Sequence, residues 1–117
     1  RVFVVGERVI GYQVDRTDPS RLWLDPTGVR VRPVTVDAEL GGTLRALARH
    51  WLLDVVAFDL LVRDDAPMFL AADAHCDWRW CERLSGEPTV STAVADWVAT
   101  RFEELLGAAT RSGTSRG

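Results

Sequence analysis

Two apolar runs joined by a short polar segment are the strongest constraint on what this chain can fold into. Val55–Val62 is an apolar run with one Asp, Arg63–Pro67 is short and mostly polar, and Met68–Ala72 is apolar again. Two apolar runs joined by a short polar segment are typical of a β-hairpin, because antiparallel neighbours need few connecting residues. We therefore predict two antiparallel strands, with Val62 opposite Met68.

The start of the chain repeats this pattern. Val2–Val5 and Arg8–Val14 predict a first hairpin around Gly6-Glu7, with Gly at the first central position that a type II′ turn prefers. Leu22–Leu24 predicts a short strand, and Val29–Val36 alternates apolar and polar residues as a half-buried strand does. The first third of the chain is therefore expected to supply strands only.

Two helices complete the predicted elements. Asp37 can cap the first, whose apolar residues recur at helical spacing at Leu40, Leu44, Leu47 and Trp51. Thr92–Leu106 predicts the second, Asp73–Pro88 a loop, and 107–117 a flexible tail. The order predicts an α+β domain over residues 1–106, with a mainly antiparallel sheet packed with two helices.

Composition restricts the function classes. The chain has 117 residues, 47% hydrophobic content and a net charge of −3, which is typical of one globular domain. No apolar run approaches the ~20 residues of a membrane helix, and no basic stripe indicates nucleic-acid binding. Two cysteines do not make a secreted disulfide scaffold, so we expect reduced thiols and a cytoplasmic location. Because Arg1 opens a strand without a Met, we interpret the chain as a fragment.

Two carboxylates on the second hairpin are the candidate site. If Val62 faces Met68, Asp59 faces Ala71 and lies diagonal to Asp73. Strand side chains alternate, so 57, 59 and 61 share a face with 69, 71 and 73. Diagonal neighbours lie about 7 Å apart, and Mg²⁺ is commonly held by one or two carboxylates with substrate phosphates. The alternative is that Asp59 faces solvent and Asp73 merely begins a loop.

A resemblance to a known family adds to this pattern. Ala57–Leu61 followed by Phe69–Asp73 resembles the distal half of the ATP-grasp signature. The stretch Phe69–Glu82 is similar to the F-L-E-(I/V)-N-P-N-G-Q-W-L-W-I-E pattern of ATP-grasp ribosomal peptide maturases, which make graspetides of the microviridin type. Its matching positions are Phe69, Leu70, Trp78, Trp80 and Glu82. Arg1–Ile10 resembles the family's R-V-x-V-V-G-x-x-V hairpin, and the resemblance extends over roughly residues 1–106.

The resemblance implies an activity and a ligand set. It implies the C-terminal half of a ligase that uses ATP and Mg²⁺ to join carboxylates to amines or hydroxyls of a precursor peptide through an acyl phosphate. Asp59 and Asp73 would be metal ligands and contacts of the cofactor, and Arg1 a catalytic contact to phosphate or the acyl group. Ala71 stands where the family has Glu, and Asp73 where it has Asn, so the metal site is degraded. Upstream ATP-grasp subdomains would be partners of this fragment.

The loop after the second hairpin offers further candidates. Trp78 and Trp80 share a face if the segment is extended, where they would stack on a peptide partner or on adenine, or else they pack on the core. A zinc site is an alternative use of His and Cys in this loop, formed from Asp73, His75, Cys76, Asp77 and Cys81. The spacing of these five residues matches no established zinc pattern. His50, near a helix end, is expected to be structural.

Three functions therefore stand after the sequence alone. The first is part of an ATP-dependent ligase acting on a ribosomal precursor peptide. The second is an inactive ATP-grasp-like module that binds a peptide or protein partner, and the third is a structural α+β domain with a coincidental Asp pair. The sequence leaves a homodimer open, as well as the peptide substrate and the bond formed.

Overall fold

One antiparallel sheet organises the molecule, and the computed structural model describes residues 1–16, 18 and 28–114. The sheet has five strands in the order β3-β2-β1-β4-β5, and every pair is antiparallel. The strands are β1 (Val2–Val5), β2 (Arg8–Arg16), β3 (Val29–Val34), β4 (Val55–Arg63) and β5 (Ala66–Asp73). The helices are α1 (Ala38–His50), α2 (Arg79–Ser85) and α3 (Thr89–Thr114). The predicted α+β class is confirmed, whereas the strand predicted at Leu22–Leu24 lies outside the described residues.

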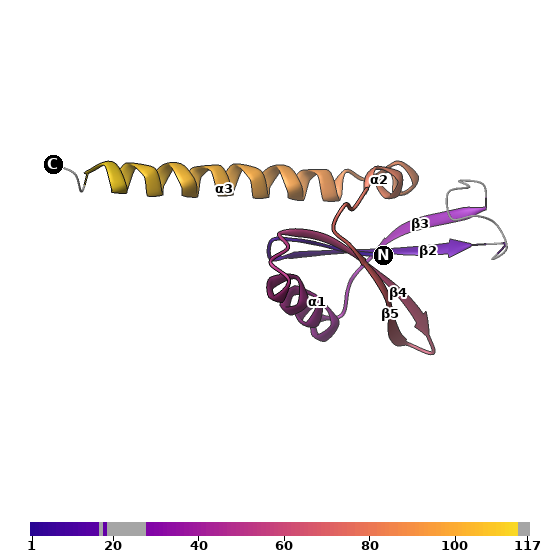
Figure 1. Cartoon of the computed structure of the whole chain (residues 1–117). Coiled ribbons are helices and arrows are strands. Elements are labelled where there is room, and N and C mark those ends of the chain that lie inside the picture. Colours follow the sequence, from indigo (N-terminus) through magenta and orange to yellow (C-terminus); the bar gives the residue numbers. More distant parts are fainter. Residues whose placement is uncertain (17, 19–27, 115–117) are drawn as a thin grey trace.

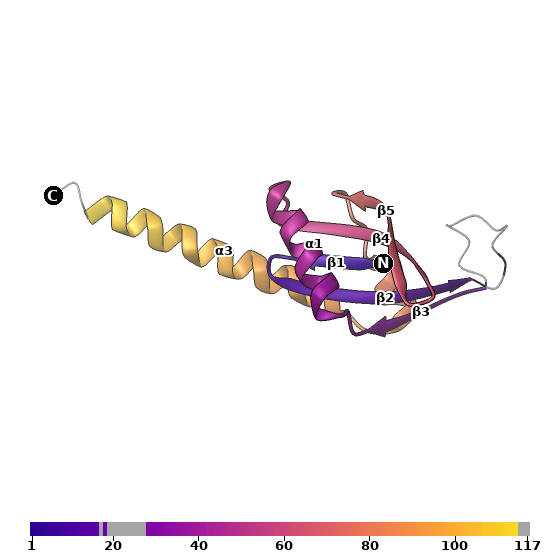
Figure 2. The same ribbon diagram turned by 90° about the horizontal axis from the view of Figure 1, so that it is seen from below.

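The helices cover opposite faces of the sheet. In Figure 1, α1 lies on one side, while α2 and the beginning of α3 lie on the other, and Figure 2 shows α1 crossing the strands. Alternation along each strand therefore divides the core in two. The buried residues on the α1 side are Val2, Val4, Leu44, Ala48, Val56 and Phe58. Those on the other side are Phe3, Val5, Tyr12, Val31, Ala57, Cys76, Cys81, Val90 and Ala93.

The first hairpin and α1 follow their sequence signals. Gly6 has φ +58° while Glu7 keeps a negative φ, as a type II′ turn requires, and a Cβ on Gly6 would stand 2.9 Å from Trp97 Cδ1. The Asp37 side chain accepts a hydrogen bond from the Leu40 backbone N–H at 3.2 Å. This bond satisfies one of the amide groups left unpaired at the start of a helix. Both predictions are confirmed.

The second hairpin forms, with a corrected register near its tip. A two-residue turn at Asp64 and Asp65, both with positive φ, places Met68 opposite Leu61 rather than Val62. A shift in register after Asp59 then restores the predicted pairing of Asp59 with Ala71, and it pairs Ala57 with Asp73, so that Asp73 lies diagonal to Asp59 as predicted. From the turn to the base of the hairpin, the paired residues are Leu61 and Met68, Leu60 and Phe69, Asp59 and Ala71, and Ala57 and Asp73.

The irregular register also moves one aromatic side chain. Phe69 pairs with Leu60, so it lies on the α1 side of the sheet, and its ring centroid is 6.2 Å from that of Phe58. The prediction that residues 69, 71 and 73 share a face is therefore wrong for Phe69. A β-bulge adds one residue to a strand and reverses the alternation beyond it. Ala71 and Asp73 keep the face of Asp59, which is the face that matters for the site.

The C-terminal part differs most from its prediction. The segment Asp73–Pro88, predicted as a loop, contains α2, and α3 begins at Thr89 and continues to Thr114 instead of ending at Leu106. Residues 107–114 of the predicted tail are therefore helical. α3 extends well beyond the sheet (Figure 1), and its large exposed apolar side chains are Val98, Phe102, Leu105 and Leu106. Among the described residues, no helix combines the length and apolar character needed to cross a membrane.

Candidate functional site

Arg1 lies at the centre of the candidate site. Its backbone carbonyl accepts a hydrogen bond from the Tyr12 N–H at 2.8 Å, which extends the β1–β2 ladder by one residue. Its side chain is only 8% exposed. The guanidinium carbon lies 5.6 Å from the ring centroid of Phe3 and 5.9 Å from that of Trp80. Two aromatic rings thus contact a cation, an arrangement that their π-electron faces favour.

The two predicted carboxylates meet at this guanidinium. Arg1 Nη1 lies 3.7 Å from Asp59 Oδ1, and Arg1 Nη2 donates a hydrogen bond to Asp73 Oδ2 at 3.2 Å. The register Val2↔Phe58 explains the first contact, because one further step along both strands places Arg1 opposite Asp59. We call Arg1, Asp59 and Asp73 the Arg1 cluster. The structure brings together all three residues that were predicted to act on a nucleotide.

The Arg1 cluster is incompletely hydrogen-bonded. Asp73 Oδ1 accepts the His75 backbone N–H at 2.9 Å, so both oxygens of that carboxylate have donors. Arg1 Nε and Asp59 Oδ1 are buried and have no hydrogen-bond partner within the described part of the chain. The 3.7 Å contact of Asp59 with Arg1 is an ion pair that is too long for a hydrogen bond. A buried carboxylate oxygen without a donor costs free energy, so Asp59 can accept a stronger partner.

The Arg1 cluster does not have the geometry of a magnesium site. Mg²⁺ requires oxygen ligands at about 2.0–2.1 Å in octahedral geometry, but the guanidinium already lies between the two carboxylates. Ala71, opposite Asp59, offers no ligand atom. Residues 1–16, 18 and 28–114 contain no group of three or more His, Cys, Asp or Glu side chains placed to hold a metal ion. As arranged, these residues fit a guanidinium rather than a resident Mg²⁺.

The two tryptophans occupy a helix start rather than an extended segment. Trp78 is the N-cap residue of α2 and Trp80 lies in its first turn. Both are half-buried against the core cluster that contains Phe3 and Cys81. Trp78 Nε1 donates to Ser91 Oγ at 2.9 Å. The packing interpretation therefore accounts for their positions, and peptide binding by Trp78 and Trp80 stays a prediction.

A structural network that the sequence did not indicate joins α2 to α3. The Glu82 carboxylate accepts the Ser91 backbone N–H, and it also accepts the Ser91 hydroxyl at 2.7 Å. Glu82 was predicted only as a matching position of the family pattern. Its carboxylate instead satisfies an amide in the first turn of α3. The sequence signal that could have indicated this network is a Glu a few residues before the start of α3, together with a Ser in the first turn of α3.

The cysteines do not support the zinc alternative. Cys76 and Cys81 are 8% and 0% exposed, whereas His75 and Asp77 are exposed and the Asp77 carboxylate accepts the Arg79 N–H. Burial raises the pKa of the Cys76 thiol, and raises the pKa of the Cys81 thiol to about 11. Zinc requires the thiolate form, which burial disfavours here. His50 is exposed and ends α1, where a basic side chain suits the helix dipole.

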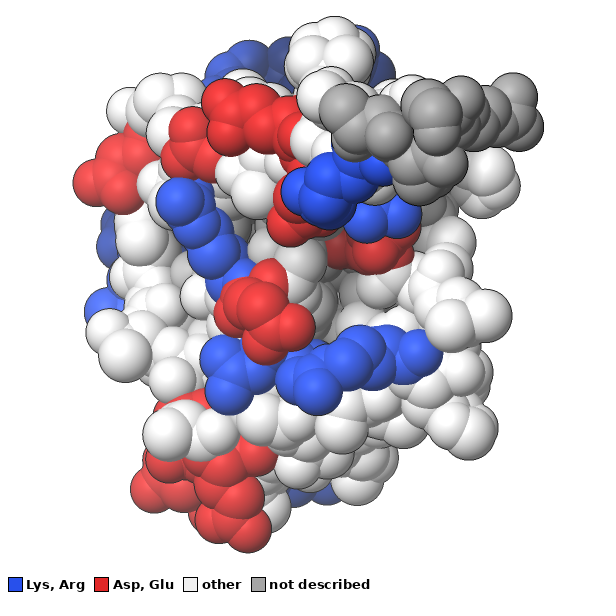
Figure 3. Space-filling model, turned by 90° about the vertical axis from the view of Figure 1, so that its left-hand side faces the viewer, with Lys and Arg blue, Asp and Glu red and all other residues white. Residues whose placement is uncertain are grey.

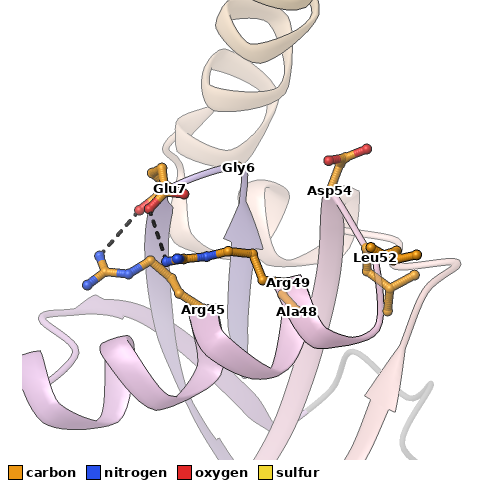
Figure 4. A pocket seen from close by; sticks show the side chains of 8 residues that line it. Gly6, Glu7, Arg45, Ala48, Arg49, Leu52 and Asp54 are labelled. Carbon is orange, nitrogen blue, oxygen red and sulfur yellow. Dashed lines mark hydrogen bonds and ion pairs between the residues drawn. The ribbon is translucent and has the colours of Figure 1, made fainter.

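A cavity of about 300 Å³ lies at the other end of β1. It is formed by the β1–β2 turn, the last turns of α1 and the connection to β4 (Figure 4). Arg45 Nη1 donates to the Glu7 carbonyl at 3.4 Å, and Arg49 Nη2 lies 3.6 Å from Glu7 Oε2. Basic and acidic side chains are mixed on the face seen in Figure 3. Since Glu7 engages both arginines, Arg49 through its carboxylate and Arg45 through its backbone carbonyl, we assign the chemistry to the Arg1 cluster and not to this cavity.

Comparison with known proteins gives the fold class. No protein-family model and no curated protein sequence matches the chain. Solved structures do match, and they show that the chain has the fold of part of an ATP-grasp ligase. The resemblance predicted from the sequence is therefore confirmed at the level of the fold.

The matching structures include complexes of an ATP-grasp ligase and of a macrocyclase. The ATP-grasp ligase PsnB complexed with a minimal precursor has a TM-score of 0.62 and 16% identity, and the match covers 80% of this chain and 33% of PsnB. A PsnB complex with a phosphomimetic precursor variant, Mg and ADP has a TM-score of 0.62 and 16% identity, and the match covers 83% of this chain and 32% of PsnB. The macrocyclase MdnC bound with precursor peptide MdnA, from Microcystis aeruginosa MRC, has a TM-score of 0.68 and 19% identity, and the match covers 86% of this chain and 32% of MdnC. The chain thus spans about a third of the length of these proteins.

Proposed function

We propose that this chain is the C-terminal part of an ATP-dependent ligase that acts on a ribosomal precursor peptide. The proposal is carried by the Arg1 cluster, which places a buried guanidinium and two carboxylates on one face of a sheet with the ATP-grasp fold. The neighbours PsnB and MdnC, each solved with a precursor, support a peptide partner for the complete protein. The PsnB complex with Mg and ADP supports ATP and Mg²⁺ as its cofactors.

The proposed reaction joins two groups of the peptide. A side-chain carboxylate attacks the γ-phosphate of ATP and releases ADP, and an amine or hydroxyl then displaces phosphate from the acyl phosphate to give an amide or ester. Arg1 presents several N–H donors in one plane, a geometry that suits phosphoryl or carboxylate oxygens. Asp59 and Asp73 hold that guanidinium in position from two neighbouring strands. The role of this chain is thus to bind and orient anionic groups.

The test uses Asp59→Asn in the complete ligase. The substitution removes the charge opposite Arg1 and keeps the shape of the side chain, so we expect ATP hydrolysis and the loss of water from the precursor peptide to be abolished. Asp65→Asn is the matched control, because Asp65 lies at the exposed tip of the same hairpin and Asn tolerates its positive φ. Unchanged turnover in Asp59→Asn, measured by phosphate release and peptide mass, would reject the ligase assignment.

A second candidate function is an inactive module that binds a peptide or protein. It is favoured by Ala71, which supplies no carboxylate opposite Asp59, and by Arg1, which already forms ion pairs with both remaining carboxylates. The edge strand β5 also exposes large apolar side chains at Met68, Phe69 and Leu70, which are 55%, 49% and 57% exposed. Exposed apolar side chains gathered on one edge strand suit a binding surface.

Thermal stabilisation discriminates between the two functions. A ligand that binds only the folded state raises the melting temperature by mass action. Stabilisation of the complete protein by ATP with Mg²⁺ supports the ligase. Stabilisation by precursor peptide alone, with no effect of the nucleotide at any concentration, supports the inactive module.

A further inference from the structure

A cation is already built into the position between Asp59 and Asp73. The Arg1 guanidinium contacts both carboxylates, at 3.7 Å and 3.2 Å, while its side chain is 8% exposed. Two carboxylates projecting from neighbouring strands would otherwise repel each other strongly in this partly buried place. The guanidinium offsets that repulsion, which is the same electrostatic task that a bound divalent cation performs.

The sheet and two aromatic rings fix this guanidinium in place. The Arg1 carbonyl is held by the Tyr12 N–H, so its backbone cannot shift without breaking the β1–β2 ladder. The rings of Phe3 and Trp80 lie 5.6 Å and 5.9 Å from the guanidinium carbon. A desolvated cation beside aromatic rings gains from their quadrupoles and loses that gain on leaving. The Arg1 side chain is therefore held in place between Asp59 and Asp73, and it is not a mobile surface side chain.

We propose that Arg1 is a built-in counter-cation that takes the place of a divalent metal between Asp59 and Asp73. With Ala71 opposite Asp59, and so only two carboxylates present, free divalent cations bind there only when the charge of Arg1 has been removed. A metal ion entering beside Arg1 would meet a like charge at close range, with one net negative charge left to attract it. This inference goes beyond the proposed function, because it applies equally to a ligase and to an inactive module.

The corner keeps the features that would receive a metal without Arg1. Asp59 Oδ1 is buried and has no hydrogen bond from the described residues, so it gains a ligand without losing a donor. The Asp73 side chain is 43% exposed, which leaves room for the water molecules that divalent cations retain. Replacing Arg1 by an uncharged residue would leave both carboxylates facing the vacated space.

The experiment measures Mn²⁺ uptake by electron paramagnetic resonance, with Mn²⁺ alone as the probe and no nucleotide. We expect wild type and Asp59→Asn to take up Mn²⁺ equally, because the Arg1 cluster binds no Mn²⁺ in either protein. We expect Arg1→Met to gain one Mn²⁺ site, with an affinity at least tenfold higher than any Mn²⁺ binding by wild type. The double variant Arg1→Met with Asp59→Asn should lose this site. Arg1→Lys keeps the charge and should gain nothing. Arg8→Met is the matched control, since Arg8 pairs with Asp96 in an exposed bridge of 3.0 Å.

Two results would overturn the proposal. One is an uptake by wild type that Asp59→Asn abolishes, which would mean that metal binds with Arg1 in place, and this comparison does not require any Arg1 variant to fold. The other is an Arg1→Met protein with native circular dichroism and no added uptake. Neither result depends on ATP turnover, so the failure of this inference is distinguishable from the failure of the proposed ligase.

Discussion

Glu82 of α2 accepts two hydrogen bonds from Ser91 of α3, one at each oxygen of its carboxylate, from the Ser91 backbone N–H and from its hydroxyl. The first amides of a helix have no partner inside the helix, and a negative charge there also interacts favourably with the helix dipole. Trp78 donates to the same hydroxyl from the start of α2. One carboxylate therefore sets how the chain passes from α2 into the long α3.

This relationship gives the first prediction. Glu82→Gln should lower the free energy of unfolding by about 1 kcal/mol and Glu82→Ala by about 2 kcal/mol, because the Ala variant leaves both Ser91 donors without this acceptor. Urea denaturation followed by circular dichroism measures both values. Glu87→Gln is the control in the same connection, where the side chain is exposed, and should change stability by less than about 0.5 kcal/mol. Equal effects at the two positions would contradict the capping role.

Removing Arg1 should destabilise the fold. Arg1→Met leaves Asp59 without its counter-charge in a partly buried place, and we expect a loss of about 3 kcal/mol. Asp59→Asn in the same chain should recover part of this loss, because the uncompensated charge disappears with it. A double-mutant cycle in urea measures the coupling. Arg8→Met, which removes an exposed pair, should cost less than about 1 kcal/mol, and additive effects of Arg1 and Asp59 would refute the pairing.

Two glycines should respond to alanine in opposite directions. A Cβ on Gly11 would stand 2.5 Å from Val36 Cγ2 and 3.0 Å from the Val34 carbonyl oxygen, so Gly11→Ala should destabilise by about 2 kcal/mol. Gly42, within α1, has nothing within 4 Å of such a Cβ. Gly42→Ala should stabilise by about 0.5–1 kcal/mol, since Ala restricts the unfolded chain and favours the helix. Thermal melts of the two variants test the contrast directly.

Stability should fall at alkaline pH because of a buried thiol. Burial raises the pKa of Cys81 from 9.0 to about 11, so between these values the unfolded chain loses a proton that the folded chain keeps. The stabilisation is complete below pH 9 and is lost as pH rises toward 11, with a decrease of roughly 2–3 kcal/mol. Burial also raises the pKa of Tyr12, which acts in the same direction. Urea midpoints across this range should decrease less steeply in Cys81→Ala, and an unchanged slope would contradict the assignment.

Local patterns predicted the individual elements well, for reasons visible in particular residues. Asp37 caps α1 because its short side chain reaches the Leu40 amide, a signal contained in neighbouring residues. By contrast, α2 is short and its start is marked by Trp78, which provides no side-chain cap. The segment from Gly107 onward has no apolar residue other than Ala, which led to the prediction of a tail, yet it is helical as far as Thr114.

The site was predictable only in part, because its geometry depends on strand order. The pairing of Asp59 with Ala71 was predicted within one hairpin, but the register at the turn would pair Asp59 with Leu70, and only the register shift after Asp59 restores Ala71. The contact of Arg1 with Asp59 requires β1 to lie beside β4, and these strands are far apart in the sequence. Alternation could have placed Phe3 on the face of Arg1, but not Trp80, which reaches the cluster from α2. The sequence thus indicated all three charged residues, but not that Arg1 lies between the two carboxylates.

Ala71→Glu should convert the corner into one that requires a metal. Ala71 is exposed and directly opposite Asp59, so the new carboxylate would lie about 5 Å away on the same face. Three carboxylates beside one guanidinium leave two net negative charges, so Mg²⁺ should bind to this variant, although wild type has no such site, and should raise its melting temperature. Ala72→Glu adds the same charge on the opposite face, beside Phe58, and should show no such response. Equal Mg²⁺ shifts in the two variants would mean that charge alone, and not placement beside Asp59, attracts the ion.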